Sequence, residues 1–484
     1  MLRPSACPGL LRIVAARDGG ICRIKLPGGE LSAAQARAIA DASARHAAGV
    51  IELTNRANLQ LRGVRSGHET ALSAALVDAG LGPMPATRAA DASNVASASW
   101  ADEVRNVMIS PAAGRDPFAL VDTTPLCAEL LTLLKSETRF AALSPKFALL
   151  LDGGERLARL DHPHDVWLAA EGVEGVRFVF GLAGCPPARA DTDANASSAT
   201  SAATVAQNVR TGSHAPAHQP HVNGTGALAA VLPSQVPALV RALLHTFIDL
   251  ATVDATRMRH LLTVHSADAL LQHAQRYVEF PLSRDASLDG WRRSNAADAS
   301  LRLGVHAQRA PGTWHAGGQP PLGRLDAVTL NGLAALAQQH GNGTLRATPW
   351  QSVLLPDIPA HALPAVLAGL NALGLACDPA QAIARLIACA GSTGCEKSLA
   401  DTKTDALQLA ARLPAGVDVH LSGCARSCAA AHCAPYTLLA AAPGVYDLYR
   451  RDGQPGFGQC VARQLTIAQA ADMLERLARS DTDA

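Results

Sequence analysis

Two stretches of the chain, residues 31–61 and 325–355, share one pattern of apolar and polar positions without a gap. In each stretch Ala and Leu recur with helical spacing, a Gly follows, and a short run of strand character then begins. That run is VIEL, residues 50–53, in the first stretch and TLRA, residues 344–347, in the second. Chance similarity between Ala-rich helices would not continue into the strands, where the period changes. The pattern therefore predicts a duplicated unit of strand, crossover helix and strand.

The duplicated unit suggests how the chain is organised. Identical residues mark the alignment: Leu31 and Leu325, Ala33 and Ala327, Ala40 and Ala334, His46 and His340, Gly49 and Gly343, Thr54 and Thr348, and Leu61 and Leu355. Copies so far apart in the sequence cannot stack as neighbours in a solenoid, so we expect them to pair across the chain and complete one sheet. The expected parts are a first half-domain (1–90), a first lobe (91–190 and 227–300), a second half-domain (301–376) and a related second lobe (377–484).

The segment that interrupts the first lobe, residues 191–226, has a different composition. It is rich in Ala, Ser, Thr, Asn and Gly and almost empty of large apolar side chains. Such a segment cannot bury enough surface to offset the entropy lost on ordering, so we expect a flexible linker or insertion. Its histidines, His214, His218 and His221, have no rigid scaffold nearby and are interpreted as part of the linker rather than as a metal-binding tract.

Length, charge and hydropathy exclude several classes of protein. With 484 residues, 48% of them hydrophobic, the chain is long enough for two or three cores. A formal charge of +1 provides no field that would attract nucleic acid. No apolar stretch is long enough to span a bilayer, and Pro, Gly and Arg interrupt the N-terminal segment before a signal-peptide core could form. We therefore expect a soluble, cytoplasmic enzyme.

The cysteines carry the strongest chemical signal. In a reducing compartment they are thiols or metal ligands rather than disulfides. Four of them form two phrases, C-x5-C at Cys389 and Cys395 and C-x3-C at Cys424 and Cys428. Four thiolates on two nearby loops suit a [4Fe-4S] cluster, whereas zinc hairpins usually space their ligands by two to four residues. Cys433 is close enough to be a spare ligand. The remaining thiols are scattered and are expected to be packed: Cys7, Cys22, Cys127, Cys185, Cys377 and Cys460.

The cysteine phrases and the duplicated unit together resemble the superfamily of sirohaem-dependent sulfite and nitrite reductases. The resemblance covers nearly the whole chain outside the linker. It implies an α+β fold in which two ferredoxin-like half-domains pair as an internal repeat, with two related α/β lobes, one of which carries a [4Fe-4S] cluster. It also implies that Cys428 bridges the cluster to the iron of sirohaem where that tetrapyrrole is bound.

The superfamily's macrocycle-contacting phrases have counterparts in this chain. The residues that the resemblance assigns to tetrapyrrole binding are Arg56 and Arg62 in TNRANLQLRG, Arg105 and Asn106 in VRNVMISPAAG, Lys146 in LSPKF, and Arg346, Thr348 and Gln351 in LRATPWQS. Arginine suits the carboxylates of a tetrapyrrole because its guanidinium donates two parallel hydrogen bonds. Any one of these arginines alone is more simply a solvated surface charge, but their placement at matched strand ends favours a binding role.

Two departures from the reductases point to one branch of the superfamily. The reductases have a second lysine two residues after the first, where this chain has Ala148, and their Gln in the first phrase is Ala57. Losing a cation weakens the case for a small anionic substrate. ACPGLL, residues 6–11, and ELTNRANLQLRG, residues 52–63, are similar instead to the cobalamin-pathway branch, the precorrin-3B synthases. That resemblance implies an oxygen-dependent monooxygenase that hydroxylates precorrin-3A at the meso carbon between rings A and D, with closure of a γ-lactone by the ring A acetate.

Two further features of the sequence concern sites for an electron-carrying nucleotide and for a mononuclear iron. No complete G-x-G-x-x-G phrase opens a helix after a strand, so we expect an external donor, an NADH-dependent reductase or a ferredoxin. DHPHD, residues 161–165, has the side-chain types of a mononuclear iron site with two histidines and one carboxylate, and a solvated loop explains it equally well. Two alternatives stay open: a sirohaem nitrite or sulfite reductase, and a cluster-bearing redox sensor without catalysis.

Overall fold

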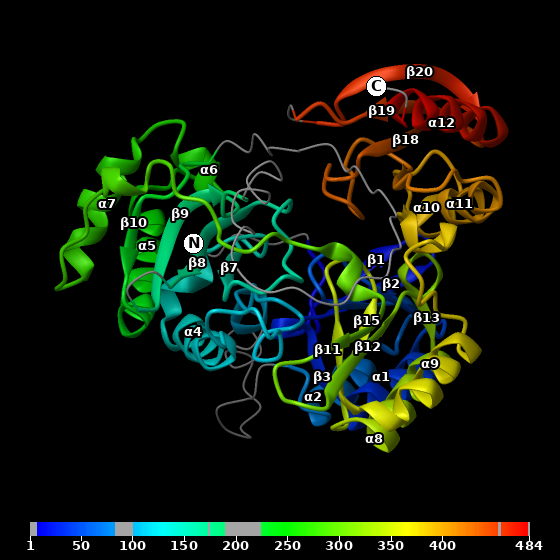
Figure 1. Ribbon diagram of the computed structural model, residues 1–484, viewed down its shortest axis with the longest axis horizontal. Coiled ribbons are helices and arrows are strands. Elements are labelled where there is room, and N and C mark those ends of the chain that lie inside the picture. The colour runs from blue at the N-terminus through cyan, green and yellow to red at the C-terminus, as the bar shows by residue number, and fades with distance from the viewer. Residues whose placement is uncertain (1–6, 83–99, 173–174, 189–223, 454–455, 483–484) are drawn as a thin grey trace, which may run out of the picture.

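The structure is a computed structural model that describes residues 7–82, 100–172, 175–188, 224–453 and 456–482 (Figure 1). Of the linker predicted over residues 191–226, only residues 224–226 fall within these ranges. The expectations about its flexibility and about His214, His218 and His221 lie outside the described residues and stay predictions. Among the described residues, no helix is both long enough and apolar enough to cross a membrane.

The two copies of the duplicated unit fold alike and lie together in one body, at the lower right of Figure 1. The first copy contains β1 (Val14–Ala16), β2 (Gly19–Ile24), β3 (Glu30–Ser32), α1 (Ala33–His46), β4 (Val50–Leu53), β5 (Leu59–Val64) and α2 (Glu69–Asp78). The second contains β11 (Gly304–Ala307), β12 (Thr313–Gly318), β13 (Arg324–Asp326), α8 (Ala327–His340), β14 (Thr344–Ala347), β15 (Val353–Pro359) and α9 (Leu363–Ala372).

The helices of the two copies begin and end at matched signals. Ser32 caps α1 through a capping box, and the side chain of Asp326 caps α8. After each helix a glycine adopts a left-handed backbone, Gly49 with a φ of 76° and Gly343 with a φ of 78°. Left-handed backbone recurs at the same spacing in further pairs: Gly28 and Leu322, Gly29 and Gly323, Ala57 and Gln351, Gly63 and Asp357, and Gly80 and Gly374. The predicted duplication is therefore confirmed, including its turns.

The expectation that the two copies complete one sheet is wrong. They form two five-stranded sheets, with the strand orders β1-β2-β5-β4-β13 and β11-β12-β15-β14-β3. Each copy gives the strand before its first helix, β3 or β13, to the sheet of the other copy. The exchange pairs the edges of β4 and β14, which would otherwise be open. A single hydrophobic core runs through both copies, so they fold as one unit.

The exchanged strands carry charges of opposite sign. Glu30 on β3 faces Arg346 on β14 and pairs with it at 2.5 Å. Arg324 on β13 faces Glu52 on β4 and pairs with it at 2.8 Å. If each strand paired within its own copy, the two glutamates would face each other, and so would the two arginines. Like charges directly opposite one another destabilise a sheet, so this pattern favours the exchange.

Reversing one of these charges should destabilise the protein, and reversing both should restore it. Glu30→Arg places a second cation against Arg346, whose side chain is only 3% exposed. The free energy of unfolding should fall by about 1–3 kcal/mol in this variant. The double variant Glu30→Arg/Arg346→Glu should recover most of the loss. Urea unfolding of the wild type, both single variants and the double variant measures the coupling; a double variant less stable than either single one would contradict this prediction.

The two lobes share one strand order, as expected for related units. The first lobe, at the left of Figure 1, contains β6 (Val107–Met108), α4 (Thr124–Ser136), β7 (Leu149–Asp152), β8 (His164–Glu171), β9 (Arg177–Gly184), β10 (Ala229–Val231), α5 (Val236–Leu250), α6 (Met258–Leu261) and α7 (Ala267–Ala274). The second, at the upper right, contains β16 (Leu386–Ala388), α10 (Gly391–Gly394), α11 (Thr402–Ala410), β17 (Val419–Ser422), β18 (Tyr436–Ala442), β19 (Val445–Arg450), β20 (Gln459–Thr466) and α12 (Ile467–Thr482).

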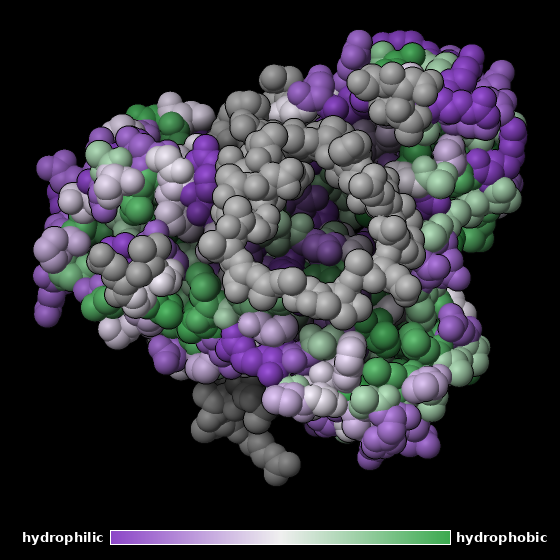
Figure 2. Space-filling model, in the orientation of Figure 1, coloured by the Kyte–Doolittle hydropathy of each residue, from purple (hydrophilic) through white to green (hydrophobic). Residues whose placement is uncertain are grey.

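In each lobe the first three strands are parallel and the next two are antiparallel. Each lobe also has its own hydrophobic core, and Figure 2 shows polar residues gathered over α12 and β20 on the outside of the second lobe. Short 3-10 turns connect the elements: Pro27–Gly29, Thr138–Ala142, Pro233–Gln235, Gln275–Tyr277, Ala286–Leu288, Ala299–Arg302, Pro321–Gly323, Ala360–Ala362 and Ala382–Arg385.

Candidate functional site

Two adjacent parallel strands of the second lobe bring the predicted cysteine ligands to one edge of their sheet. Cys389 directly follows β16, and Cys424 lies in the loop after β17, its parallel neighbour. Since parallel strands end at the same edge, the two loops lie together. They are in direct contact, because the backbone N–H of Gly423 donates to Cys389 Sγ at 3.3 Å. Cys395 and Cys428 complete the same two loops.

Cys428 lies within electrostatic reach of the other three cysteines. Burial raises the pKa of Cys428, and the charges of Cys424, Cys389 and Cys395 raise it further. No three His, Cys, Asp or Glu side chains of the described residues are placed to share a single metal ion. Thiolates around one zinc ion lie about 3.8 Å apart, whereas those of a cubane bind separate irons and lie further apart. Four thiol donors on two contacting loops fit a [4Fe-4S] cluster, in which each iron takes one protein thiolate.

The cysteine loops pack against their neighbours at glycines. A Cβ added to Gly423 would lie 1.7 Å from Ser398 Oγ, and one added to Gly394 would lie 2.6 Å from Arg62 Nη2. Neither position has room for a side chain without a shift of its surroundings. Cys428 is the exposed member of the set, whereas the other three thiols are partly buried. The open side of the cysteine site is therefore the side of Cys428.

Arg62 supports the cysteine loop from the first copy of the repeat. Its guanidinium donates two hydrogen bonds to Asp18, at 2.8 and 2.9 Å, and one to the carbonyl oxygen of Gly394 at 2.6 Å. Glu52 lies 3.7 Å away. These partners occupy the guanidinium and link the repeat to the residue before Cys395. The tetrapyrrole contact assigned to Arg62 stays a prediction, and the role visible here is to position this loop.

Arg56 lies on the open side of the site. Its neighbour Asn55 donates to the carbonyl oxygen of Cys428 at 3.3 Å, and Arg56 Nε lies 3.3 Å from His162 Nε2. Burial lowers the pKa of Arg56 to about 10, and the positive charges of Arg257 and Arg23 contribute. A buried guanidinium in this surrounding favours an anionic ligand.

Sequence reasoning missed three cations in this region, Arg23, Lys25 and Arg257. Arg23 interacts electrostatically with Cys428, which places it beside the cysteine site. Lys25 donates to the carbonyl oxygen of Glu103, and burial lowers its pKa to about 7. The available signal for Arg23 and Lys25 was the alternation along β2 and just after it, opposite the buried Cys22 and Ile24, whereas Arg257 lies before α6 and had no such signal.

The residues from the first lobe have different surroundings. Arg105 pairs with Asp102 at 2.5 Å and donates to the carbonyl oxygen of Leu81. Asn106 donates to three backbone carbonyl oxygens, the shortest contact being 2.7 Å to Pro145, so its amide organises the chain. Lys146 is exposed and has no ion-pair partner among the described residues. Their contact with a tetrapyrrole stays a prediction.

The predicted residues of the second copy do not join the cysteine site. Arg346 lines a separate cavity together with Arg115. Thr348 Oγ1 lies 2.7 Å from Ser352 Oγ and organises a tight turn in which Gln351 is left-handed, as Thr54 does for the matching turn of the first copy. The two phrases nevertheless meet at Gly29, where an added Cβ would lie 2.1 Å from the Ala347 carbonyl oxygen and 3.3 Å from Ala57 Cβ. Binding by Arg346, Thr348 and Gln351 stays a prediction.

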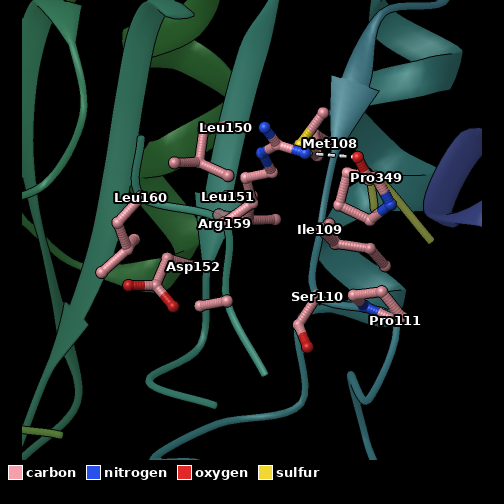
Figure 3. Close-up of a pocket in the computed structure, with 11 residues that line it drawn as sticks. Met108, Ile109, Ser110, Pro111, Leu150, Leu151, Asp152, Arg159, Leu160 and Pro349 are labelled. Carbon is pink, nitrogen blue, oxygen red and sulfur yellow. Dashed lines mark hydrogen bonds between the residues drawn. The ribbon is translucent and has the colours of Figure 1, made fainter. Parts of the chain in front are cut away.

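The two loops of the first lobe that match the cysteine loops close on a small cavity instead. Figure 3 shows Arg159 donating to the carbonyl oxygen of Pro349 beside Met108 and Leu150. The cavity measures about 10 Å³, which is about the size of one water molecule. The corresponding loops of this lobe thus enclose a water-sized cavity lined mainly by apolar side chains.

The mononuclear iron site proposed for residues 161–165 is not supported. Asp165 binds Arg257 at 2.9 Å and accepts the backbone N–H groups of Met258 and Ala148. Asp161 binds Arg159 at 2.7 Å. Both carboxylates are therefore engaged, and the described residues contain no three-ligand group for an ion. The spare thiol Cys433 is buried and donates to the carbonyl oxygen of Asp161 at 2.9 Å.

The scattered cysteines are only partly packed. Cys22 and Cys127 are buried, whereas Cys7, Cys185, Cys377 and Cys460 are partly exposed.

Buried histidines should make the protein sensitive to acid. Burial lowers the pKa of His164 to about 3 and that of His315 to about 4. Because the unfolded chain takes up these protons first, stability is full above about pH 6.5 and falls as the pH drops toward the folded-state pKa values. Each histidine should contribute about 1.4 kcal/mol per pH unit to this fall. Urea unfolding between pH 7.5 and 5 measures it. His164→Phe should flatten the slope, and an unchanged slope would contradict this assignment.

Comparison with known families and structures agrees with this architecture. The nitrite/sulfite reductase ferredoxin-like half domain matches residues 15–79 and 306–373, the two copies of the repeat. The nitrite and sulphite reductase 4Fe-4S domain matches residues 100–282, which is the first lobe. The four cysteines lie outside that match, in the second lobe, which repeats its strand order.

Individual relatives extend the comparison to most of the chain. Precorrin-3B synthase of a Sinorhizobium species is 27% identical over 100% of this chain and 90% of its own length. The ferredoxin–nitrite reductase of Synechococcus elongatus is 28% identical over 90% of this chain and 77% of its own length. The ferredoxin–nitrite reductase of Zea mays is 28% identical over 84% of this chain and 67% of its own length. The solved Mycobacterium tuberculosis NirA protein has a TM-score of 0.71 with 21% identity, covering 95% of this chain and 80% of its own.

Proposed function

Since the chain belongs to the nitrite and sulfite reductase superfamily, we propose that within it this protein is a precorrin-3B synthase. The supporting observation is the share of each chain that the similarity covers, because the similarity to the Sinorhizobium precorrin-3B synthase spans this whole chain and 90% of that protein. The chain spans only 67% of the maize nitrite reductase. The relatives are named as oxidoreductases, which supports an enzyme rather than a sensor. We place the enzyme in the cytoplasm, where its thiols stay reduced.

The proposed reaction hydroxylates precorrin-3A and closes a γ-lactone. One atom of O2 enters the substrate at the meso carbon between rings A and D, and the other leaves as water. Two electrons and two protons balance this step, and an external reductase or ferredoxin supplies the electrons. The ring A acetate then closes the lactone by adding its carboxyl O–H across a double bond of the macrocycle, so no further atom or electron is gained or lost.

The cysteine loops would hold the electron-transfer group. Cys389, Cys395, Cys424 and Cys428 are the residues that would bind a [4Fe-4S] cluster, which supplies one-electron transfer when bound. The chain's own contribution is to fix the loops, through the Gly423 N–H on Cys389 Sγ and through Arg62 on the Gly394 carbonyl. Such hydrogen bonds and burial set the potential of a cluster.

Three neighbouring cations, Arg56, Arg23 and Lys25, would bind and orient the substrate. Arg56, Arg23 and Lys25 are buried or partly buried, and no acidic side chain forms an ion pair with any of them among the described residues. A tetrapyrrole with many carboxylates would compensate these charges, and each arginine could bind one carboxylate through two hydrogen bonds. Holding the macrocycle in one orientation selects which meso carbon reacts.

The alternative is a sirohaem nitrite or sulfite reductase. The ferredoxin–nitrite reductases are as similar in sequence as the precorrin-3B synthase, which favours this alternative. The absence of a cation at Ala148, a buried position, speaks against a site for a small anion.

One preparation can separate the two proposals. Protein purified without oxygen should show iron–sulfur absorption and, on adding precorrin-3A, O2 and a reductant, form the hydroxylated lactone. Sirohaem absorption with turnover of nitrite or sulfite, and no product from precorrin-3A, would establish the alternative. Protein without iron would refute both.

A further inference from the structure

The strand ladder of the second lobe changes its pattern where it reaches the cysteine site. β16 and β17 are parallel, and Ala388 lies opposite Leu421. The ladder continues past the end of β16, because the backbone N–H of Cys389 donates to the Leu421 carbonyl oxygen at 3.2 Å. One step further, a regular parallel ladder would join the Gly423 N–H to the Cys389 carbonyl oxygen. Gly423 instead donates its N–H to Cys389 Sγ, at 3.3 Å.

The Cys389 carbonyl group, which this change leaves without its ladder partner, has a replacement donor in Thr402. The Thr402 hydroxyl donates to the Cys389 carbonyl oxygen at 3.0 Å, and Thr402 Oγ1 also lies 3.4 Å from Cys389 Sγ. The threonine itself is 0% exposed, so water does not compete for its hydroxyl. A backbone carbonyl that is shielded from water and has no donor costs free energy. The Thr402 hydroxyl therefore removes the cost of giving the Gly423 N–H to the sulfur.

Thr402 is held in this position by the start of a helix. It is the first residue of α11, and the side chain of the N-cap residue Asp401 accepts the Thr404 N–H. The cysteine loop packs directly on it, since a Cβ added to Gly391 would lie 3.0 Å from the Thr402 backbone nitrogen. α10, which begins at Gly391, lies beside α11 in Figure 1. The backbone of α11 therefore fixes where the hydroxyl meets Cys389.

The sulfur of Cys389 differs in this respect from those of the other three cysteines. Within the described residues it is the only one of the four that accepts a hydrogen bond from a backbone N–H group. Cys428, by contrast, is the exposed thiol on the open side of the site. Hydrogen bonds to the sulfurs of a cluster offset the negative charge that reduction adds, and so raise its reduction potential. The contact at Cys389 is therefore the point at which the folded chain acts most directly on that potential.

We propose that Thr402 is a positioning residue of the electron-transfer site, whose hydroxyl occupies the Cys389 carbonyl and thereby directs the Gly423 N–H to the Cys389 sulfur. The consequence is a higher reduction potential for a [4Fe-4S] cluster at this site. This inference rests on the proposed assignment of the cluster to the four cysteines. Without the hydroxyl, the Gly423 N–H returns to the carbonyl, its regular ladder partner, and the sulfur loses its hydrogen bond. No bond to iron forms or breaks in this change.

The reduction potential of full-length protein purified without oxygen tests the proposal, with dithionite as the reductant and paramagnetic resonance as the signal. Thr402→Val replaces the hydroxyl by a methyl group of similar size. Its equilibrium constant for one-electron reduction should fall at least about tenfold, which is a shift of about 59 mV to lower potential. Thr402→Ser keeps the hydroxyl and should stay within about threefold of the wild type. Thr437→Val, the control, removes a buried hydroxyl from β18 of the same sheet and should leave the potential unchanged.

Iron content and urea unfolding are measured first for every variant. An unchanged potential in iron-loaded Thr402→Val protein overturns the proposal even if that protein unfolds more easily, because a purely structural threonine alters stability alone. An equal fall in Thr402→Ser overturns it as well. If Thr402→Val protein holds no iron, retention of iron and potential by Thr402→Ser supports the role of the hydroxyl, and loss of iron from both overturns it. Absence of iron from the wild type is a separate result, which refutes the cluster assignment and the proposed function.

Discussion

Cys424→Ser protein should lack the iron–sulfur absorption of the wild type and lose more than about 100-fold of its activity, since even residues behind the ligands of a metal site contribute 10- to 100-fold. Cys424 lies in the loop after β17, next to Gly423, whose N–H contacts Cys389 Sγ. Removing one thiolate leaves one iron of a cubane without its protein ligand. Iron analysis and paramagnetic resonance of protein purified without oxygen measure the loss.

Cys460→Ser is the matched control for this substitution. Cys460 is also partly exposed and also lies in the second lobe, but it is on β20, where its Sγ contacts the Ala462 carbonyl oxygen at 3.6 Å. This variant should keep its iron content and its spectrum. A Cys424→Ser protein with full iron content would show that the four cysteines are not the ligands.

Arg56→Gln should weaken tetrapyrrole binding and stabilise the ligand-free protein at the same time. The pKa of Arg56 is lowered to about 10 because the folded protein disfavours its charge. At neutral pH the arginine is charged in both the folded and the unfolded chain, so this cost of about 3 kcal/mol is present on folding and is removed by the substitution. Losing a buried contact to a substrate carboxylate should weaken binding by about 2–4 kcal/mol, or roughly 30- to 900-fold.

Fluorescence or absorption titration with a tetrapyrrole and urea unfolding together test both effects. Arg476→Gln on α12 removes the same charge from an exposed position and should change neither. Weaker binding without a gain in stability would mean that Arg56 has a compensating partner in the folded protein. A gain in stability with unchanged binding would remove Arg56 from the substrate site.

The stability gain is informative because it separates Arg56 from Arg62. Sequence reasoning treated the two arginines alike, since both belong to one phrase. In the structure Arg62 is compensated by Asp18 and the Gly394 carbonyl, so replacing it should destabilise the protein and disturb the cysteine loop. Replacing Arg62, which positions a loop, should therefore lower the stability of the ligand-free protein, whereas replacing Arg56, which would bind a ligand, should raise it.

Local signals in the sequence determined much of this protein. The sequence showed the duplication because the strand Val50–Leu53 and the helix before it recur as the strand Thr344–Ala347 and its preceding helix. The spacing of apolar residues in such elements follows from the geometry of the helix and the strand themselves. The sequence also showed that Cys389 lies near Cys395 and that Cys424 lies near Cys428, because each of these two sets belongs to one short loop. Patterns of this kind depend on neighbours within a few residues.

The tertiary structure decided which distant groups meet. It exchanged β3 and β13 between the copies, where the sequence had suggested one shared sheet. It also placed Arg346 at a separate cavity rather than at the cysteines, and it brought Arg23 beside Cys428. No local period encodes such contacts, because burial, charge pairing and strand-edge coverage are settled only when segments far apart in the sequence pack against each other.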